Sequence, residues 1–153
     1  MSLPAIDAPA VPLIRSARLD DAARLAQLAG ELGYSASERQ IRERLEHLSS
    51  SRDHAVCVAE TVDGTVSGWI AVERRLLLES GFKAEITGLV VALQARRTGV
   101  GQALVLVAER WATELGLEIM IVRSNIARTE SHLFYRDIGY DTEKTQQVYR
   151  KRL

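Results

Sequence analysis

The hydrophobic period changes twice between residues 84 and 123, and this feature constrains the fold more than any other. Ala84–Leu93 has the length and composition of a strand, Val100–Leu115 has the spacing of a strongly apolar helix, and Glu118–Arg123 is again a short, buried-type strand. Gly116, with Leu117 behind it, is typical of a helix end. Two strands joined by one helix run parallel, with a right-handed crossover. The sequence therefore predicts a β-α-β unit here.

The other segments predict hairpins and further helices around this unit. Asp63-Gly64 indicates a tight turn and Leu76–Phe82 a second one, so the strands that they join are antiparallel. Gly88 inside its strand indicates a bulge or a close backbone approach. The remaining predicted elements are a strand at Leu13–Ala17, a helix from Asp20 to Gly33, a helix capped by Ser37 and Gln40, strands at Ala55–Ala59 and Val66–Val72, a helix at Ile126–Ile138, and a last strand at Gln146–Arg152. We expect an α/β (α+β) fold whose mixed, mostly antiparallel sheet has six to seven strands with a central parallel pair, flanked by about four helices.

Length and composition suit one ordinary globular domain. The chain has 153 residues, of which 46% are hydrophobic and 26% charged. We expect a flexible leader at residues 1–12 and a single domain at residues 13–153. The formal net charge of +0 argues against a nucleic-acid binder, and no apolar run reaches the ~18 residues of a membrane span. The leader lacks the pattern of a signal peptide, so we expect a cytoplasmic protein. Cys57 is the only cysteine, which excludes an intrachain disulfide and favours a core role for it.

A glycine-rich loop, Arg96-Arg97-Thr98-Gly99-Val100-Gly101, stands between a predicted strand and a predicted helix. Glycine allows a close approach of ligand to backbone, and a helix N-terminus offers free N–H groups and partial positive charge to a phosphate. A P-loop would need Lys and Ser/Thr after the second glycine, where Gln102-Ala103 stand. A dinucleotide fingerprint would need a third glycine, where Leu104 stands.

A second motif follows the last strand of the β-α-β unit. Asn125 comes directly after that strand, and the predicted helix then carries Phe134-Tyr135 and ends at Gly139-Tyr140. Helical spacing places Arg128, His132 and Tyr135 on one face. A phenol has a pKa near ~10, so Tyr135 can serve as a proton donor.

The two motifs together resemble the GNAT family of N-acetyltransferases. Arg96, Gly99 and Gly101 match its pyrophosphate loop, and the segment from Asn125 to Tyr140 matches its second acetyl-CoA motif. The resemblance implies acetyl-CoA as co-substrate, no metal, and direct transfer of acetyl to a primary amine of a small molecule or peptide in a ternary complex. It implies that Tyr135 hydrogen-bonds and protonates the CoA sulfur. The residues that it implies in acetyl-CoA binding are Leu89, Val90, Val91, Arg96, Arg97, Thr98, Gly99, Val100, Gly101, Gln102, Asn125 and Tyr135.

The strand ahead of the loop also offers a general base. Glu85 is the best candidate to take the proton from the acceptor's ammonium group, because only a free amine attacks a thioester. A solvated edge glutamate is an equally good interpretation of Glu85. Glu73 and Glu79 are alternative carboxylates, and either would also attract a cationic acceptor.

Other functions remain open at this point. A CoA-binding sensor that has lost catalysis and an unrelated nucleotide-binding α/β protein are the alternatives. The acceptor remains open among amino acid, polyamine, aminoglycoside, peptide N-terminus and protein lysine, since acceptor loops vary freely on one fold. Leu76-Leu77-Leu78 is an apolar patch that fits a homodimer contact.

Overall fold

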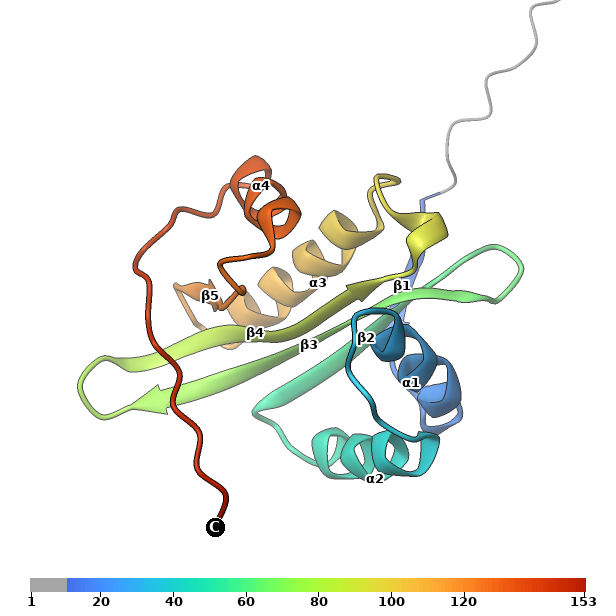
Figure 1. Cartoon of the computed structure of the whole chain (residues 1–153), viewed down its shortest axis with the longest axis horizontal. Coiled ribbons are helices and arrows are strands. Elements are labelled where there is room, and N and C mark those ends of the chain that lie inside the picture. Colours follow the sequence, from blue (N-terminus) through green and yellow to red (C-terminus); the bar gives the residue numbers. More distant parts are fainter. Residues whose placement is uncertain (1–10) are drawn as a thin grey trace, which may run out of the picture. The chain divides into compact units, whose positions relative to one another are not determined.

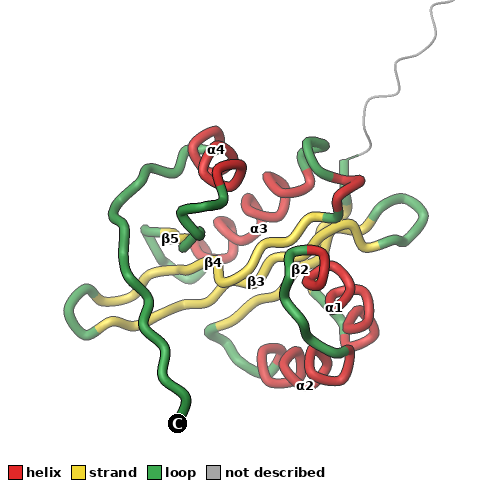
Figure 2. The backbone as a smooth tube through the Cα atoms, viewed as in Figure 1, coloured by secondary structure: helices red, strands yellow, loops and turns green. Residues whose placement is uncertain are grey.

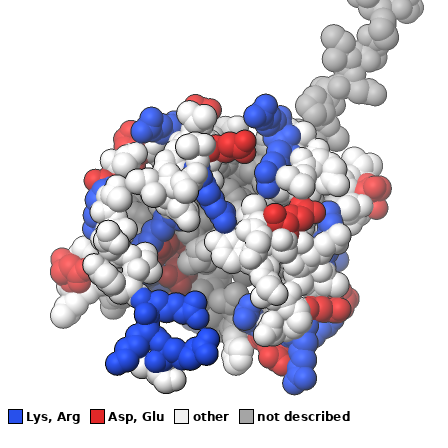
Figure 3. Space-filling model, viewed as in Figure 1, with Lys and Arg blue, Asp and Glu red and all other residues white. Residues whose placement is uncertain are grey.

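The computed structural model describes residues 11–153, in two compact units. One unit ends at Val122 and the other is Arg123–Leu153. Most of the leader predicted at residues 1–12 lies outside the described residues. That residues 13–153 act as one domain stays a prediction. Acidic and basic side chains are interspersed over the face seen in Figure 3, in keeping with the formal net charge of +0.

The first unit contains a five-stranded sheet in the order β1-β2-β3-β4-β5 (Figure 1). Its strands are β1 (Leu13–Ser16), β2 (His54–Glu60), β3 (Val66–Leu77), β4 (Gly81–Val91) and β5 (Met120–Val122). The pairs from β1 to β4 are antiparallel and β4–β5 is parallel. The mixed, mostly antiparallel sheet with a parallel pair is therefore confirmed. In the described residues it has five strands, not six to seven, and its parallel pair lies at one end of the strand order.

The missing strand is the one predicted at Gln146–Arg152, and that prediction is wrong. Residues 140–153 contain no strand, and Figure 2 draws this segment as loop. Alternating polarity alone does not make a strand, because a strand also needs a partner for its backbone N–H and C=O groups. The side chains of neighbouring Val148 and Tyr149 are both exposed, at 87% and 89%, so neither face of this segment is buried.

The described residues form four α-helices, as expected. They are α1 (Ala22–Glu31), α2 (Glu38–Ser49) and α3 (Val100–Glu114) in the first unit, and α4 (Thr129–Asp137) in the second. Ser37 and Gln40 form the predicted capping box at the start of α2. Gly116 has a φ of 76° and closes α3. The N–H of Leu117 donates to the carbonyl of Ala112 over 3.0 Å and the N–H of Gly116 to the carbonyl of Thr113 over 2.9 Å, as in a Schellman end.

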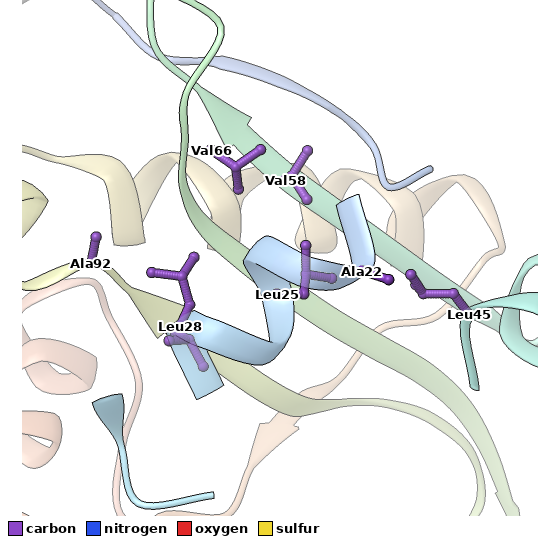
Figure 4. Packing of buried hydrophobic residues seen from close by; sticks show 8 residues of the cluster. Ala22, Leu25, Leu28, Leu45, Val58, Val66 and Ala92 are labelled. Carbon is purple, nitrogen blue, oxygen red and sulfur yellow. The ribbon is translucent and has the colours of Figure 1, made fainter. Parts of the chain in front are cut away.

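The helices of the first unit cover both faces of its sheet, as Figure 1 shows. Figure 4 shows the core on the α1–α2 face, where the helices pack on strands β2, β3 and β4; its residues are Ala22, Leu25, Leu28, Leu45, Val58, Val66, Val90 and Ala92. Helix α3 covers the opposite face, where Leu104 and Val100 approach Gly68 so closely that an added Cβ would lie 3.2 and 3.3 Å from them. No helix among residues 11–153 is long and apolar enough to cross a membrane.

Candidate active site

A bulge in β4 decides which of its side chains share a face. Ala71 pairs with Gly88 and Val72 with Ile86, so Thr87 is the extra residue. In a regular strand, residues three apart point to opposite faces. Because of the bulge, Glu85 and Gly88 both point to the α1–α2 face. The bulge predicted at Gly88 is thereby confirmed.

Gly88 is also a place of close approach. An added Cβ would lie 2.7 and 2.9 Å from two ring carbons of Trp69, on β3. The Trp69 indole packs against the α1–α2 core, and its Nε1 is buried without a hydrogen-bond partner among the described residues. A side chain at position 88 would therefore require the indole to move.

Glu85 is a buried carboxylate in an ion-pair cluster. Only 6% of the surface of Glu85 is exposed. Arg75, on β3, donates from Nη1 to Glu85 Oε2 over 2.5 Å, and its Nε lies 3.4 Å from Glu73 Oε1. Glu73 in turn lies 3.4 Å from Nε2 of His54, on β2. The alternative interpretation of Glu85 as a solvated edge glutamate is therefore wrong, because this side chain is buried. The alternative carboxylate Glu79 is exposed in the β3–β4 turn, away from this cluster.

The edge of β4 beyond the bulge is not paired with β5. The β4–β5 ladder covers Ala84, Glu85 and Ile86 alone. The N–H of Ala92 donates to Ser67 on β3, so by strand alternation the backbone groups of Leu89 and Val91 point to the opposite edge. The acetyl-CoA-binding role of Leu89 and Val91 stays a prediction. Val90 instead has its side chain in the α1–α2 core.

The glycine-rich loop leads from β4 into α3. Gly99 is the N-cap of α3 with a φ of 89°, a conformation that favours glycine, and no side chain caps this end. The first-turn N–H groups of Val100, Gly101 and Gln102 have no intrahelical acceptor. No atom lies within 4 Å of the place of a Cβ on Gly99. The loop therefore presents open space, amide donors and the positive end of a helix, which suits a phosphate group.

The other loop side chains have local roles. Arg97 has a φ of 63°, which is strained for a residue with a side chain. Arg96 donates from Nε to the carbonyl of Val91 over 3.5 Å, and Thr98 donates its hydroxyl to the carbonyl of Ala95. All three side chains are exposed. The Thr98 hydroxyl is thus already used as a donor within the loop.

The second unit holds Asn125 and Tyr135. Asn125 Oδ1 accepts from the N–H of Ala127 over 2.9 Å, and His132 Nε2 lies 3.0 Å from the Asn125 carbonyl oxygen. Burial raises the pKa of Tyr135 to about 12. Its phenol therefore stays protonated at neutral pH. The start predicted for this helix is too early, because Arg128 is the N-cap of α4 with a non-helical ψ of 79°, so it does not share a helical face with Tyr135.

The sequence does not single out Arg75, which contacts Glu85, His54, which contacts Glu73, or Trp69, which lies against Gly88. Arg75 lies two residues from Glu73, and in a strand this spacing puts both on one face. That signal was available, but its meaning depends on the register of β3 against β4. Cys57 is half-buried, and burial raises the pKa of its thiol, as expected for an unreactive cysteine.

Comparisons with known proteins show the family of this chain. Residues 21–140 match the "Acetyltransferase (GNAT) family". Aminoglycoside N(6')-acetyltransferase type 1 of Klebsiella aerogenes is 33% identical over 133 residues, with 80% of this chain and 86% of the relative covered. This relative and the family match show that the protein is an N-acetyltransferase.

Solved structures share the fold at lower identity. A structure of AAC(6')-Iy in complex with the bisubstrate analogue CoA-S-monomethyl-acetylneamine is 20% identical, with a TM-score of 0.83 over 94% of this chain and 100% of that one. Glucosamine-6-phosphate N-acetyltransferase from Arabidopsis thaliana is 22% identical, with a TM-score of 0.78 over 92% of this chain and 99% of that one. Because the family match covers residues 21–140, more than half of the sequence, the chain belongs to the acetyltransferase (GNAT) family.

Proposed function

We propose that this protein transfers acetyl from acetyl-CoA to a primary amine of a small molecule, by direct attack in a ternary complex. The observation that carries the proposal is the arrangement along β4 and α3. A buried carboxylate, an unpaired strand edge and an uncapped helix N-terminus follow one another in 18 residues of chain, from Glu85 to Gln102.

The residues of the loop fit the pyrophosphate of CoA. The amides of the first turn of α3 donate to phosphate oxygens, and the exposed Arg96 and Arg97 add positive charge. Leu89 and Val91 offer backbone groups to pantetheine along the unpaired edge of β4. Bound acetyl-CoA supplies an activated acetyl group and a thiolate leaving group. A helix dipole and fixed amides favour an anionic ligand here without metal.

Two side chains handle the protons in this proposal. Glu85 accepts the proton from the acceptor's ammonium group, directly or through a water, which leaves a neutral amine to attack. Tyr135 donates a hydrogen bond to the departing sulfur and supplies its proton. A phenol with a pKa of about 12 is fully protonated at the working pH and can fill this role. The half-buried Cys57 takes no part, because burial disfavours its thiolate.

We infer the class of amine acceptor from the relatives of this protein. The curated relative is named for acetylation of aminoglycosides, and one structural neighbour is named for acetylation of glucosamine 6-phosphate. Aminoglycosides and glucosamine 6-phosphate both carry amines on sugar rings, so we propose an amino sugar as the first class of acceptor and peptides as the second.

We also propose that the enzyme is cytoplasmic. A homodimer through Leu76-Leu77-Leu78 fits the exposed side chains of Leu76 (65%) and Leu78.

Calorimetry with acetyl-CoA and thiol release over a panel of amines test the function. The panel contains sisomicin, glucosamine 6-phosphate, spermidine and a peptide with a free N-terminus. We expect micromolar binding of acetyl-CoA, thiol release with one sugar amine, and loss of that release in Glu85→Gln. Binding without release on any amine would favour the non-catalytic sensor. Absence of CoA binding would refute the assignment of the Gly99 loop.

A further inference from the structure

Two glutamates stand directly opposite each other on the α1–α2 face. Glu73 on β3 and Glu85 on β4 are paired in register. Like charges directly opposite on neighbouring strands destabilise a sheet, and the burial of Glu85 strengthens their repulsion. Sheet stability alone does not account for this pair.

Arg75 relieves the repulsion from a diagonal position. It follows Glu73 by two residues on β3, so its side chain lies on the same face. Its guanidinium contacts both carboxylates, at 2.5 Å from Glu85 Oε2 and 3.4 Å from Glu73 Oε1. The shorter contact is to the more buried glutamate, whose side chain is 8% exposed against 27% for Glu73.

The charged groups around Glu85 on this face come from three strands. Glu73 and Arg75 are on β3, and Lys83 on β4 stands opposite Arg75. His54 on β2 stands opposite Glu73. On the β5 side, Glu85 pairs with Ile121, between Met120 and Val122, so β5 brings no titratable group there. Arg75 is therefore a cation in direct contact with Glu85, and it also contacts the second carboxylate, Glu73.

We propose that Arg75 is a positioning residue that holds the Glu85 carboxylate beside the β4 bulge, ready to accept the proton of the acceptor's ammonium group. The inference rests on the proposed role of Glu85 as base. Arg75 donates to Glu85 Oε2 over 2.5 Å, and a base must be held within hydrogen-bond reach of the proton that it takes. Glu73 also contacts the guanidinium, at 3.4 Å, and so helps to fix its orientation.

A direct test measures kcat and KM in the thiol-release assay, with acetyl-CoA and sisomicin as substrates. Arg75→Met should lower kcat by about tenfold or more and leave KM for acetyl-CoA nearly unchanged, because it removes the contact that fixes the base. Glu73→Gln should change kcat less, because the contact between Arg75 and Glu85 remains. Arg75→Lys should restore part of kcat, because an ammonium group can donate to the same carboxylate. Arg74→Met is the matched control: Arg74 lies on the opposite face, paired with Asp53, and should leave both constants unchanged.

A fall in kcat without a change in KM, and its partial rescue by lysine, are not expected from general loss of structure, and thermal melts check that each variant is folded. Wild-type kcat in folded Arg75→Met would overturn the inference. Wild-type turnover in Glu85→Gln would instead refute the role of Glu85 as base, and no thiol release by the wild-type protein on any amine would refute the proposed function.

Discussion

The ring of Tyr140 packs edge-on against the ring of Tyr135, with their centroids 5.7 Å apart. The N–H of Tyr140 also donates to the carbonyl oxygen of Tyr135 over 2.9 Å, and Gly139 between the helix and Tyr140 has a φ of 100°. These are the hydrogen bond and side-chain contact of a Schellman motif at the end of α4. The helix end thus orients the phenol that we propose as proton donor.

Tyr135→Phe should remove the proton donor and keep the packing. The ring contact with Tyr140 survives in phenylalanine, so we expect kcat to fall by about 10²–10⁴-fold while acetyl-CoA affinity changes little. Stopped-flow thiol release and calorimetry measure the two quantities. Tyr149→Phe, at an exposed tyrosine of the same unit, serves as the control and should behave as wild type. Equal turnover in Tyr135→Phe and wild type would show that another group protonates the sulfur.

Gly99→Ala should weaken CoA binding and stability together. The φ of 89° at this N-cap is unfavourable for alanine by about 1–2 kcal/mol, and the loop amides should lose their alignment on the phosphates. Gly33→Ala is the control, because Gly33 has a similar φ of 84° in open space at the end of α1. Both variants should lose similar stability in urea unfolding. Calorimetry should show weaker acetyl-CoA binding in Gly99→Ala alone, and equal affinities would contradict a phosphate site in this loop.

Gly88→Ala should disturb the bulge that places Glu85. The new methyl group would lie within 3 Å of two Trp69 ring carbons, so the indole must move, at a cost of about 1–3 kcal/mol. Urea unfolding measures the stability, and near-UV circular dichroism reports the tryptophan environment. Gly30→Ala, inside α1 with open space around it, should instead stabilise by up to about 1 kcal/mol. An unchanged tryptophan signal in Gly88→Ala would argue against this contact.

Asp21 should make stability depend on acid pH. Arg15 donates to both carboxylate oxygens of Asp21, over 2.8 and 2.9 Å, and this hydrogen bonding holds the Asp21 pKa below its usual range. Because the folded pKa is lowered, the unfolded chain binds more protons in acid. The contribution is therefore present above the unfolded pKa of about 3.9 and is lost as the pH falls through the lower folded value.

Urea midpoints measured from pH 7 to pH 3 test this dependence. Asp21→Asn should lose about 2 kcal/mol at pH 7 and show a flatter decline in acid than wild type, because a charge-assisted hydrogen bond is gone. Asp20→Asn, at the exposed neighbouring carboxylate, should keep the wild-type dependence. Parallel curves for Asp21→Asn and wild type would mean that other carboxylates govern acid unfolding.

The sequence alone determined the local features of this protein. The capping box at Ser37 and Gln40 and the glycine ends of α1, α3 and α4 depend on residues within one turn of each other, so their signals are complete in the sequence. The same holds for the loop at Gly99, whose φ and position before α3 follow from its own residues. Element order and family membership rest on such local patterns.

Only the tertiary structure decided which distant side chains meet. Arg75, Glu73 and Glu85 come together through the register of β3 on β4, and a slip of one residue would turn every side chain of a strand to the other face. The bulge at Thr87 changes which face of the sheet the side chains on either side of it share. No local signal in the sequence fixes the residue at which this bulge occurs. The absence of a strand at residues 146–152 has the same cause, since a strand exists only where a partner supplies its hydrogen bonds. Pairing between segments far apart in the chain is a property of the whole fold, and it is this pairing that sets the surroundings of Glu85.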